Sequence, residues 1–226
     1  MSEKSSSTSE KPLKHIDSLP QGVTTGSTIL VASSGDPSRN AFGFQTLSRF
    51  GDSNDRALVV TTTESADETV ATAEQVYAAG DQPSLGLVDT VSKQQSLVAP
   101  TGTVPIVFTP SSSDLERLVL ALTELSTDGT PVDGARHLLV RSLTPILDSI
   151  STEQVCSMLQ QISGLRTESG ITLFGIDYTA HDEPTIESLV EQVDGVLWIA
   201  PSPNGTVDIE YRPATGRFTD NSSLDR

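Results

Sequence analysis

A chain of 226 residues can form one α/β domain with a full hydrophobic core, but it is too short for two domains of ordinary size. The formal net charge of -16, from 14 basic and 30 acidic residues, argues against binding to nucleic acids or to anionic membrane surfaces. The single cysteine, Cys156, excludes an internal disulfide and a cysteine-ligated metal site.

The basic residues are unevenly distributed along the chain. Only four are lysines, and three of these, Lys4, Lys11 and Lys14, lie within the first 14 positions. An acidic, lysine-poor composition is typical of proteins in multimolar salt, where screening limits charge repulsion to a range of about 3 Å. An ordinary acidic protein is the alternative, but the scarcity of lysine favours salt adaptation. Because no run of 18 apolar residues and no hydrophobic leader occurs, we expect a cytoplasmic protein without a membrane span.

Residues 1–20 are polar, rich in serine and without periodicity, which predicts a disordered tail. Strand and helix patterns then alternate regularly. We therefore assign residues 21–215 to one domain and residues 216–226 to a flexible C-terminal tail.

Eight segments have the composition of β-strands. They are residues 27–33, 57–63, 85–90, 106–109, 137–143, 171–177, 196–200 and 207–211. The inner segments are continuous apolar runs, which is typical of parallel strands that helices cover on both faces. Residues 207–211 instead alternate apolar and polar side chains, as an antiparallel edge strand does.

Capping-box patterns predict helices that begin at Ser65, Ser113 and Ser151, each followed by apolar residues at helical spacing. Strands that alternate with amphipathic helices indicate an α/β fold. We expect a three-layer α/β/α sandwich around a mostly parallel sheet with an antiparallel C-terminal edge.

Residues 26–41 have the frame of a phosphate-binding loop, in which an apolar strand enters a Gly/Ser turn and then a helix. The pattern G-x-x-x-x-G-K-[ST] supplies backbone N–H groups, a lysine for the phosphates and a hydroxyl for magnesium. In the register that fits best, Ser33 and Ser38 replace the glycines, Arg39 replaces the lysine and Asn40 replaces the hydroxyl residue. The frame is present, but most of its phosphate chemistry is missing.

Several segments in the same order resemble the RecA-like ATPases of the KaiC type, especially small archaeal members. The segments are the lead into the loop (residues 19–31), FGFQTL (42–47), VVTTTES (59–65), RHLLVRSLT (136–144), HDEPT (181–185) and VDGVL (193–197). The resemblance covers about residues 19–215 and implies a RecA-like sheet with Walker A and Walker B motifs. It also implies assembly into rings or filaments, so a homo-oligomer is one expectation.

The resemblance places Arg141 at the Walker B aspartate, and it leaves only Glu64 of the family's paired glutamates. Glu210 stands where the family has a lysine that reaches a neighbouring subunit's nucleotide, which weakens the reason to assemble. Phosphoryl transfer depends on positioning and on charge from lysine and magnesium. Without the lysine, the hydroxyl and the Walker B carboxylate, we expect no ATP hydrolysis and no metal site.

Asp36 places a carboxylate at a helix N-terminus, where the macrodipole favours an anion by about 0.3–1 kcal/mol. Asp36 can therefore fill the phosphate position from within the chain. Arg39 and Arg141 could form an anion pocket, or Arg141 could pair with Asp36 or Glu64 as a structural salt bridge. The structural pairing is the favoured alternative.

The resulting hypothesis is a catalytically inactive KaiC-like domain that acts as a regulatory or signalling protein-interaction module in a salt-adapted archaeal cytoplasm. The alternative is a metal-independent ATP-binding switch without efficient hydrolysis. No other cofactor is expected, and the partner is a protein. The altered nucleotide site is assigned to Gly35, Asp36, Ser38, Arg39, Asn40, Glu64 and Arg141.

Overall fold

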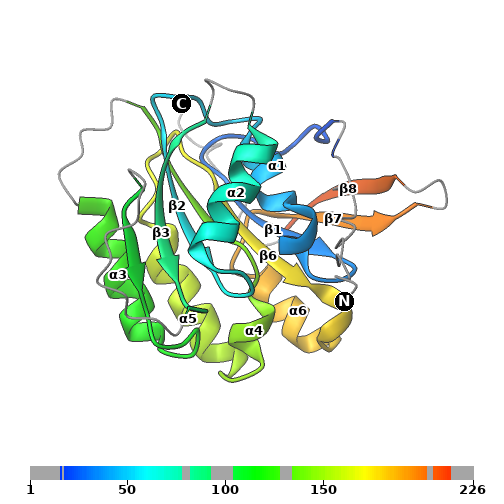
Figure 1. Cartoon of the computed structure of the whole chain (residues 1–226). Helices are drawn as coiled ribbons and strands as arrows, with labels where there is room; N and C mark the ends of the chain where they lie inside the picture. The colour runs from blue at the N-terminus through cyan, green and yellow to red at the C-terminus, as the bar shows by residue number, and fades with distance from the viewer. Residues whose placement is uncertain are drawn as a thin grey trace, which may run out of the picture.

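One eight-stranded sheet organises the chain (Figure 1). The computed structural model describes residues 16, 18–77, 82–92, 104–127, 134–202 and 206–214. The strand order is β4-β3-β2-β5-β6-β1-β7-β8, and every pairing is parallel except that of β7 with β8. The strands are β1 (Thr28–Ser33), β2 (Arg56–Thr61), β3 (Ser84–Asp89), β4 (Ile106–Phe108), β5 (Arg136–Val140), β6 (Thr172–Asp177), β7 (Gly195–Pro201) and β8 (Val207–Pro213).

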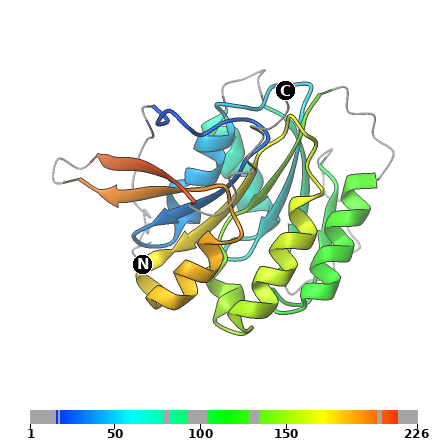
Figure 2. The ribbon, with the colours of Figure 1, turned by 180° about the vertical axis from the view of Figure 1, so that it is seen from behind.

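Helices cover both faces of the sheet, so the domain is a three-layer α/β/α sandwich (Figures 1 and 2). One face carries α1 (Phe42–Leu47) and α2 (Ala66–Val76). The other carries α3 (Leu115–Thr127), α4 (Thr144–Leu147), α5 (Thr152–Ser163) and α6 (Glu183–Val190). The predicted fold class and the antiparallel C-terminal edge are both confirmed.

The apolar run of β1 shows why the sheet needs two helical layers. Successive strand residues point to opposite faces. Leu30 and Ala32 belong to the core cluster on the side of α3, α5 and α6, whereas Ile29 and Val31 belong to the cluster on the side of α1 and α2. All four side chains are fully buried, so a sheet with one exposed face would leave half of this strand in water.

Side chains cap the helices largely where the sequence predicts. Ser65 and the Glu68 side chain form the full capping box of α2, and the Ser151 hydroxyl accepts a hydrogen bond from Gln154 N at the start of α5. The prediction for α3 is wrong by one residue, because Asp114 and not Ser113 accepts from Arg117 N, at 3.2 Å. A carboxylate is as good an acceptor at this position as a hydroxyl, so the capping pattern alone could not separate them.

His137 in β5 is fully buried and has a structural role. Its Nδ1 accepts a hydrogen bond from Ile171 N at 3.1 Å, and its Nε2 lies 3.1 Å from Asp55 Oδ2. Burial raises the pKa of the Asp55 carboxyl, but hydrogen bonds from His137 and from the backbone outweigh that effect and hold this pKa below its usual value. The pair fastens the Asp52–Asp55 turn to the sheet.

The predicted tails remain predictions. Residues 1–15, 17 and 215–226 lie outside the part of the chain that the structure describes. Ile16, within the segment assigned to the N-terminal tail, is buried in the cluster under α1 and α2. None of the helices that the structure describes has the length and hydropathy needed to span a bilayer.

Candidate functional site

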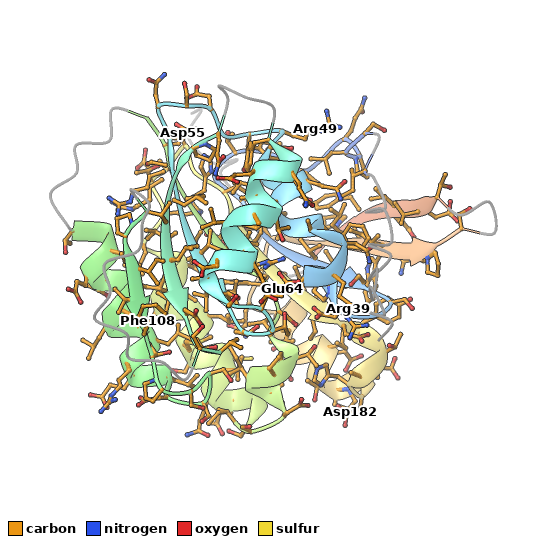
Figure 3. The ribbon with its side chains drawn as sticks, in the orientation of Figure 1. Arg39, Arg49, Asp55, Glu64, Phe108 and Asp182 are labelled. Atoms are coloured by element: carbon orange, nitrogen blue, oxygen red, sulfur yellow. The ribbon has the colours of Figure 1, made fainter. Side chains whose placement is uncertain are left out.

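The carboxyl ends of the parallel strands form one edge of the sheet, and the predicted site residues lie there. The loop after β1 contains Gly35 and Asp36, Glu64 follows β2, and Arg141 directly follows β5. Strand β6 lies between β1 and β5, so its last residue, Asp177, reaches the same edge. Figure 3 shows Arg39 and Glu64 at this edge, away from the opposite end of the sheet, where Asp55 lies. Ligands of open α/β sheets bind at such edges.

Arg141 lies at the centre of this edge and is only 4% exposed. Its Nη1 forms an ion pair with Glu64 Oε2 and donates a hydrogen bond to Thr69 Oγ1 at 2.9 Å. Its Nη2 donates to the carbonyl oxygen of Ser38, also at 2.9 Å. The guanidinium carbon lies 5.3 Å from the centre of the Phe44 ring, within the range of a cation–π contact. Burying a charge is costly unless the charge is paired and hydrogen-bonded. Four segments of the chain supply these partners to Arg141.

The structure selects between the two pairings that the sequence leaves open. Arg141 pairs with Glu64, as one alternative predicted, and Asp36 faces its own loop instead. Asp36 Oδ1 accepts a hydrogen bond from Ser38 N at 2.9 Å and caps the 3-10 helix η1 (Pro37–Asn40). The expected internal carboxylate at a helix start is thus present, although the helix is a single 3-10 turn.

The backbone of the loop is not arranged as a phosphate cradle. Gly35 N donates to Asp177 Oδ1 at 3.0 Å, Ser34 N donates to the carbonyl oxygen of Ile199 at 3.2 Å, and Ser38 N is taken by Asp36. Pro37 has no N–H to offer. The donors that a phosphate would need at these positions are therefore satisfied within the protein, two of them by carboxylates that would repel an anion.

The sequence pattern predicts that the loop leads directly into a helix. In the structure, a break in the backbone separates the loop and its short 3-10 turn from α1. Ala41 adopts a left-handed backbone conformation, with φ of 53°, between η1 and α1. Such a conformation is uncommon for a residue other than glycine. Because of this break, α1 begins only at Phe42 and is not continuous with η1.

The remaining predicted site residues lie apart from Arg141. Arg39 is exposed, and its side chain forms no ion pair with any residue that the structure describes. The carbonyl oxygen of Asn40 accepts a hydrogen bond from Gln45 Nε2 at 2.7 Å on the side of α1. No group of three or more His, Cys, Asp or Glu side chains within the described ranges is placed to hold a metal ion.

Three contributors to the site are absent from the sequence prediction. Asp177, Thr69 and Phe44 all contact the loop or Arg141. A signal existed for Asp177, because it ends an apolar strand at the edge where ligands bind. Thr69 and Phe44 look like ordinary helix residues in the sequence, and only the packing of α1 and α2 shows that they contact the guanidinium.

We predict that Asp177→Asn lowers the free energy of unfolding by about 1–2 kcal/mol at neutral pH, since its carboxylate accepts charge-assisted hydrogen bonds. Burial raises the pKa of the Asp177 carboxyl, but hydrogen bonds from Thr179 and from Gly35 N outweigh that effect and lower this pKa. The stabilisation is therefore complete above the ordinary unfolded value of about 3.9 and is lost as pH falls through the folded-state pKa. Urea unfolding of both proteins at neutral pH and below pH 4 tests this. An equal difference at both pH values would contradict it.

The fold and the site define an α/β domain whose eight-stranded, mostly parallel sheet loosely fits a RecA-like fold. Within that class, the chain belongs to a family of unknown function, DUF7504, whose model matches residues 26–199. The matched range includes β1, the loop after it, Glu64, Arg141 and Asp177. No curated protein matches the sequence.

Two solved structures from Pyrococcus horikoshii align with most of the chain. The uncharacterized protein PH0321, in complex with an unknown peptide, aligns with a TM-score of 0.57 and 15% sequence identity over 84% of each chain. The second, a structural study of PH0250 from strain OT3, aligns with a TM-score of 0.49 and 12% identity over 83% of this chain and 87% of that chain. At 15% identity, the similarity to PH0321 concerns the fold alone.

Proposed function

We propose that this domain is a catalytically inactive relative of the KaiC-like ATPases and acts through contacts with other proteins, as a regulatory or signalling module. The observation that carries the proposal is the buried ion pair of Arg141 with Glu64. The resemblance places this cation where magnesium chemistry would need a carboxylate, and the carboxylate of Glu64 neutralises the cation. Separating the pair to admit a metal–nucleotide complex would leave a buried charge without a partner, which is strongly unfavourable.

The loop supports the same proposal independently. Asp36 and Asp177 accept the hydrogen bonds of Ser38 N and Gly35 N, so the two carboxylates occupy the donors on which a phosphate would depend. A nucleotide would have to displace both and bring its own negative charge next to them.

One observation favours the alternative of a metal-independent ATP-binding switch. Arg39 is exposed beside the loop and has no ion-pair partner among the described residues, so it is accessible to a phosphate. A guanidinium binds phosphate well, but a single exposed arginine supplies little affinity without backbone donors. The inactive protein-binding domain is therefore the better-supported function.

Protein binding is also supported by analogy of fold. The similar P. horikoshii protein was solved in complex with an unknown peptide, so this architecture can present a peptide-binding surface. The acidic, lysine-poor composition supports the proposed setting, a salt-adapted archaeal cytoplasm.

Calorimetric titration of ATP into the full chain in multimolar KCl, with and without magnesium, tests the proposal. We expect no binding in either condition. Magnesium-independent binding that is lost in Arg39→Ala, but kept in the matched exposed variant Arg117→Ala, would establish the switch instead. Binding that requires magnesium would show that Arg141 does not exclude a metal, and the proposed inactivity would be wrong.

A further inference from the structure

Helices α3 and α5 pack side by side on one face of the sheet (Figure 2, green and yellow-green), and a groove of about 390 Å³ lies between them. Its least exposed lining residues are apolar, namely Leu115 and Val119 from α3 and Met158 from α5. Ser157 and Gln161 of α5 line it with exposed polar side chains. The α3/α5 groove thus has an apolar floor and a polar wall, which suits the two faces of an amphipathic helix.

Leu120 borders the α3/α5 groove and is 60% exposed, more than any other large apolar side chain among the described residues. It belongs to neither core cluster, because α3 buries Leu118, Leu122 and Leu125 on the other side of the helix. A single exposed leucine is ordinary on a protein surface. Here, however, the leucine lies beside an apolar floor, so a partner that enters the groove buries it and gains affinity.

The outer surfaces of the same two helices are acidic. Glu116, which lines the groove, Glu124 and Glu153 are all exposed and form no ion pair with a residue that the structure describes. Arg117 is the only basic residue of α3 and α5, and it pairs with Asp114 at 3.3 Å. Basic residues on a partner therefore complement this face, whereas a second copy would bring the same carboxylates against it.

We propose that the α3/α5 groove is the docking site for an amphipathic helix of a partner protein, with apolar anchors at helical spacing and basic residues along its flanks. The proposal names the surface of the protein-binding function proposed above and rests on it. A helix that lies in the groove packs on two helices at once and covers Leu120. The side chains of Ser157 and Gln161 form no hydrogen bond within the described part of the chain, so they are available to the flank of that helix.

Methionine-methyl NMR on the unmodified full chain tests the place of binding. The chain has two methionines, Met1 and Met158, and Met158 lines the groove. The probe is a synthetic helical peptide of about five turns, with leucines and one central phenylalanine on one face and lysines on both flanks. We expect the Met158 signal to move saturably, because the phenylalanine ring lies next to it. No saturable binding, or binding that leaves the Met158 signal in place, would overturn the proposal.

Calorimetric titration of the same peptide tests the apolar contact. Leu120→Ser should weaken binding by about tenfold or more, because the exposed leucine no longer contributes its burial. A peptide of identical composition, reordered so that its apolar residues no longer share one face, should not bind. Equal binding of both peptides would show attraction to net charge alone, and equal binding to Leu120→Ser and to the unmodified chain would place the site elsewhere. Either result would overturn the proposal.

The charge contact has its own matched pair of variants. Glu116→Lys should weaken binding of the peptide by about threefold, as expected for an exposed ion pair. Glu187→Lys makes the same change of net charge at an exposed position of α6 and should have little effect. In multimolar KCl the Glu116 effect should shrink, while the Leu120 effect persists. Equal weakening by Glu116→Lys and Glu187→Lys would refute the assignment of basic flanks to the groove.

The remaining outcomes are also decisive. If the unmodified chain forms a concentration-dependent dimer that Leu120→Ser abolishes, a second copy occupies the groove and the partner-helix assignment is wrong. If Leu120→Ser fails to fold, the NMR result on the unmodified chain decides alone. None of these experiments involves ATP. A positive ATP titration would therefore overturn the proposed inactivity without affecting the groove, and failure of the groove would leave the ATP result unchanged.

Discussion

Replacing Arg141 with methionine should lower the free energy of unfolding by about 3 kcal/mol. Removal of one partner from a buried ion pair typically costs about 3–5 kcal/mol, because the other charge remains without compensation. Here the carboxylate of Glu64 is about a quarter exposed, so water can compensate part of the loss. Thr69 Oγ1 and the carbonyl oxygen of Ser38 also lose their donor. Methionine retains most of the volume, and the effect therefore reports charge and hydrogen bonding rather than a cavity.

Urea unfolding of four proteins measures the coupling between the two residues: the unmodified chain, Arg141→Met, Glu64→Gln and the double variant. The double variant should recover part of the loss, because no buried charge is then left unpaired. Arg212→Met, which breaks the exposed pair with Glu210, is the matched control and should change stability little. The Arg141 effect should persist in multimolar KCl, since salt screens buried pairs weakly. An Arg141→Met chain as stable as the unmodified one would show that the pair is dispensable.

The layered fold could be predicted because its signals are local. The apolar run of β1 is buried on both faces, and the alternation in β8 matches its place at the antiparallel edge. Capping at Ser65 and Ser151 depends on residues within one turn, so the sequence contains the full information. The break at Ala41 could not be predicted, because a left-handed alanine has no sequence signal and is held by its surroundings.

The site was predictable only in part, for a different reason. The position of Arg141 made an ion pair with a nearby carboxylate the natural expectation, but the choice of Glu64 over Asp36 depends on how the loop folds back. The hydrogen bond from Gly35 N to Asp177 joins residues 142 positions apart in the chain. Such a contact follows from β6 lying beside β1, and strand order is not encoded in local periodicity.

Alanine at Gly175 should be among the most damaging single substitutions at this edge, with a loss of about 3 kcal/mol in the free energy of unfolding. Gly175 pairs with Val31 in the register of β6 with β1, and its carbonyl oxygen accepts from Leu143 N at 2.7 Å. A Cβ atom at this position would lie 2.1 Å from the carbonyl oxygen of Arg141 and 2.9 Å from Pro37 Cγ. The first neighbour is backbone and cannot rotate away, so β5 and β6 would have to separate.

Gly164→Ala is the matched control, because Gly164 has φ of -74° at the end of α5 and its nearest atom, Gln161 O, would lie 3.8 Å from a new Cβ. Alanine there should be neutral or should stabilise the fold by up to about 1 kcal/mol through the unfolded chain. Since Arg141 directly follows β5, displacement of β5 should also disturb its pair with Glu64. The losses from Gly175→Ala and Arg141→Met should therefore be less than additive in the double variant. Full additivity would mean that the strand contact and the ion pair stabilise the domain separately, and that Gly175 does not help to hold Arg141 in place.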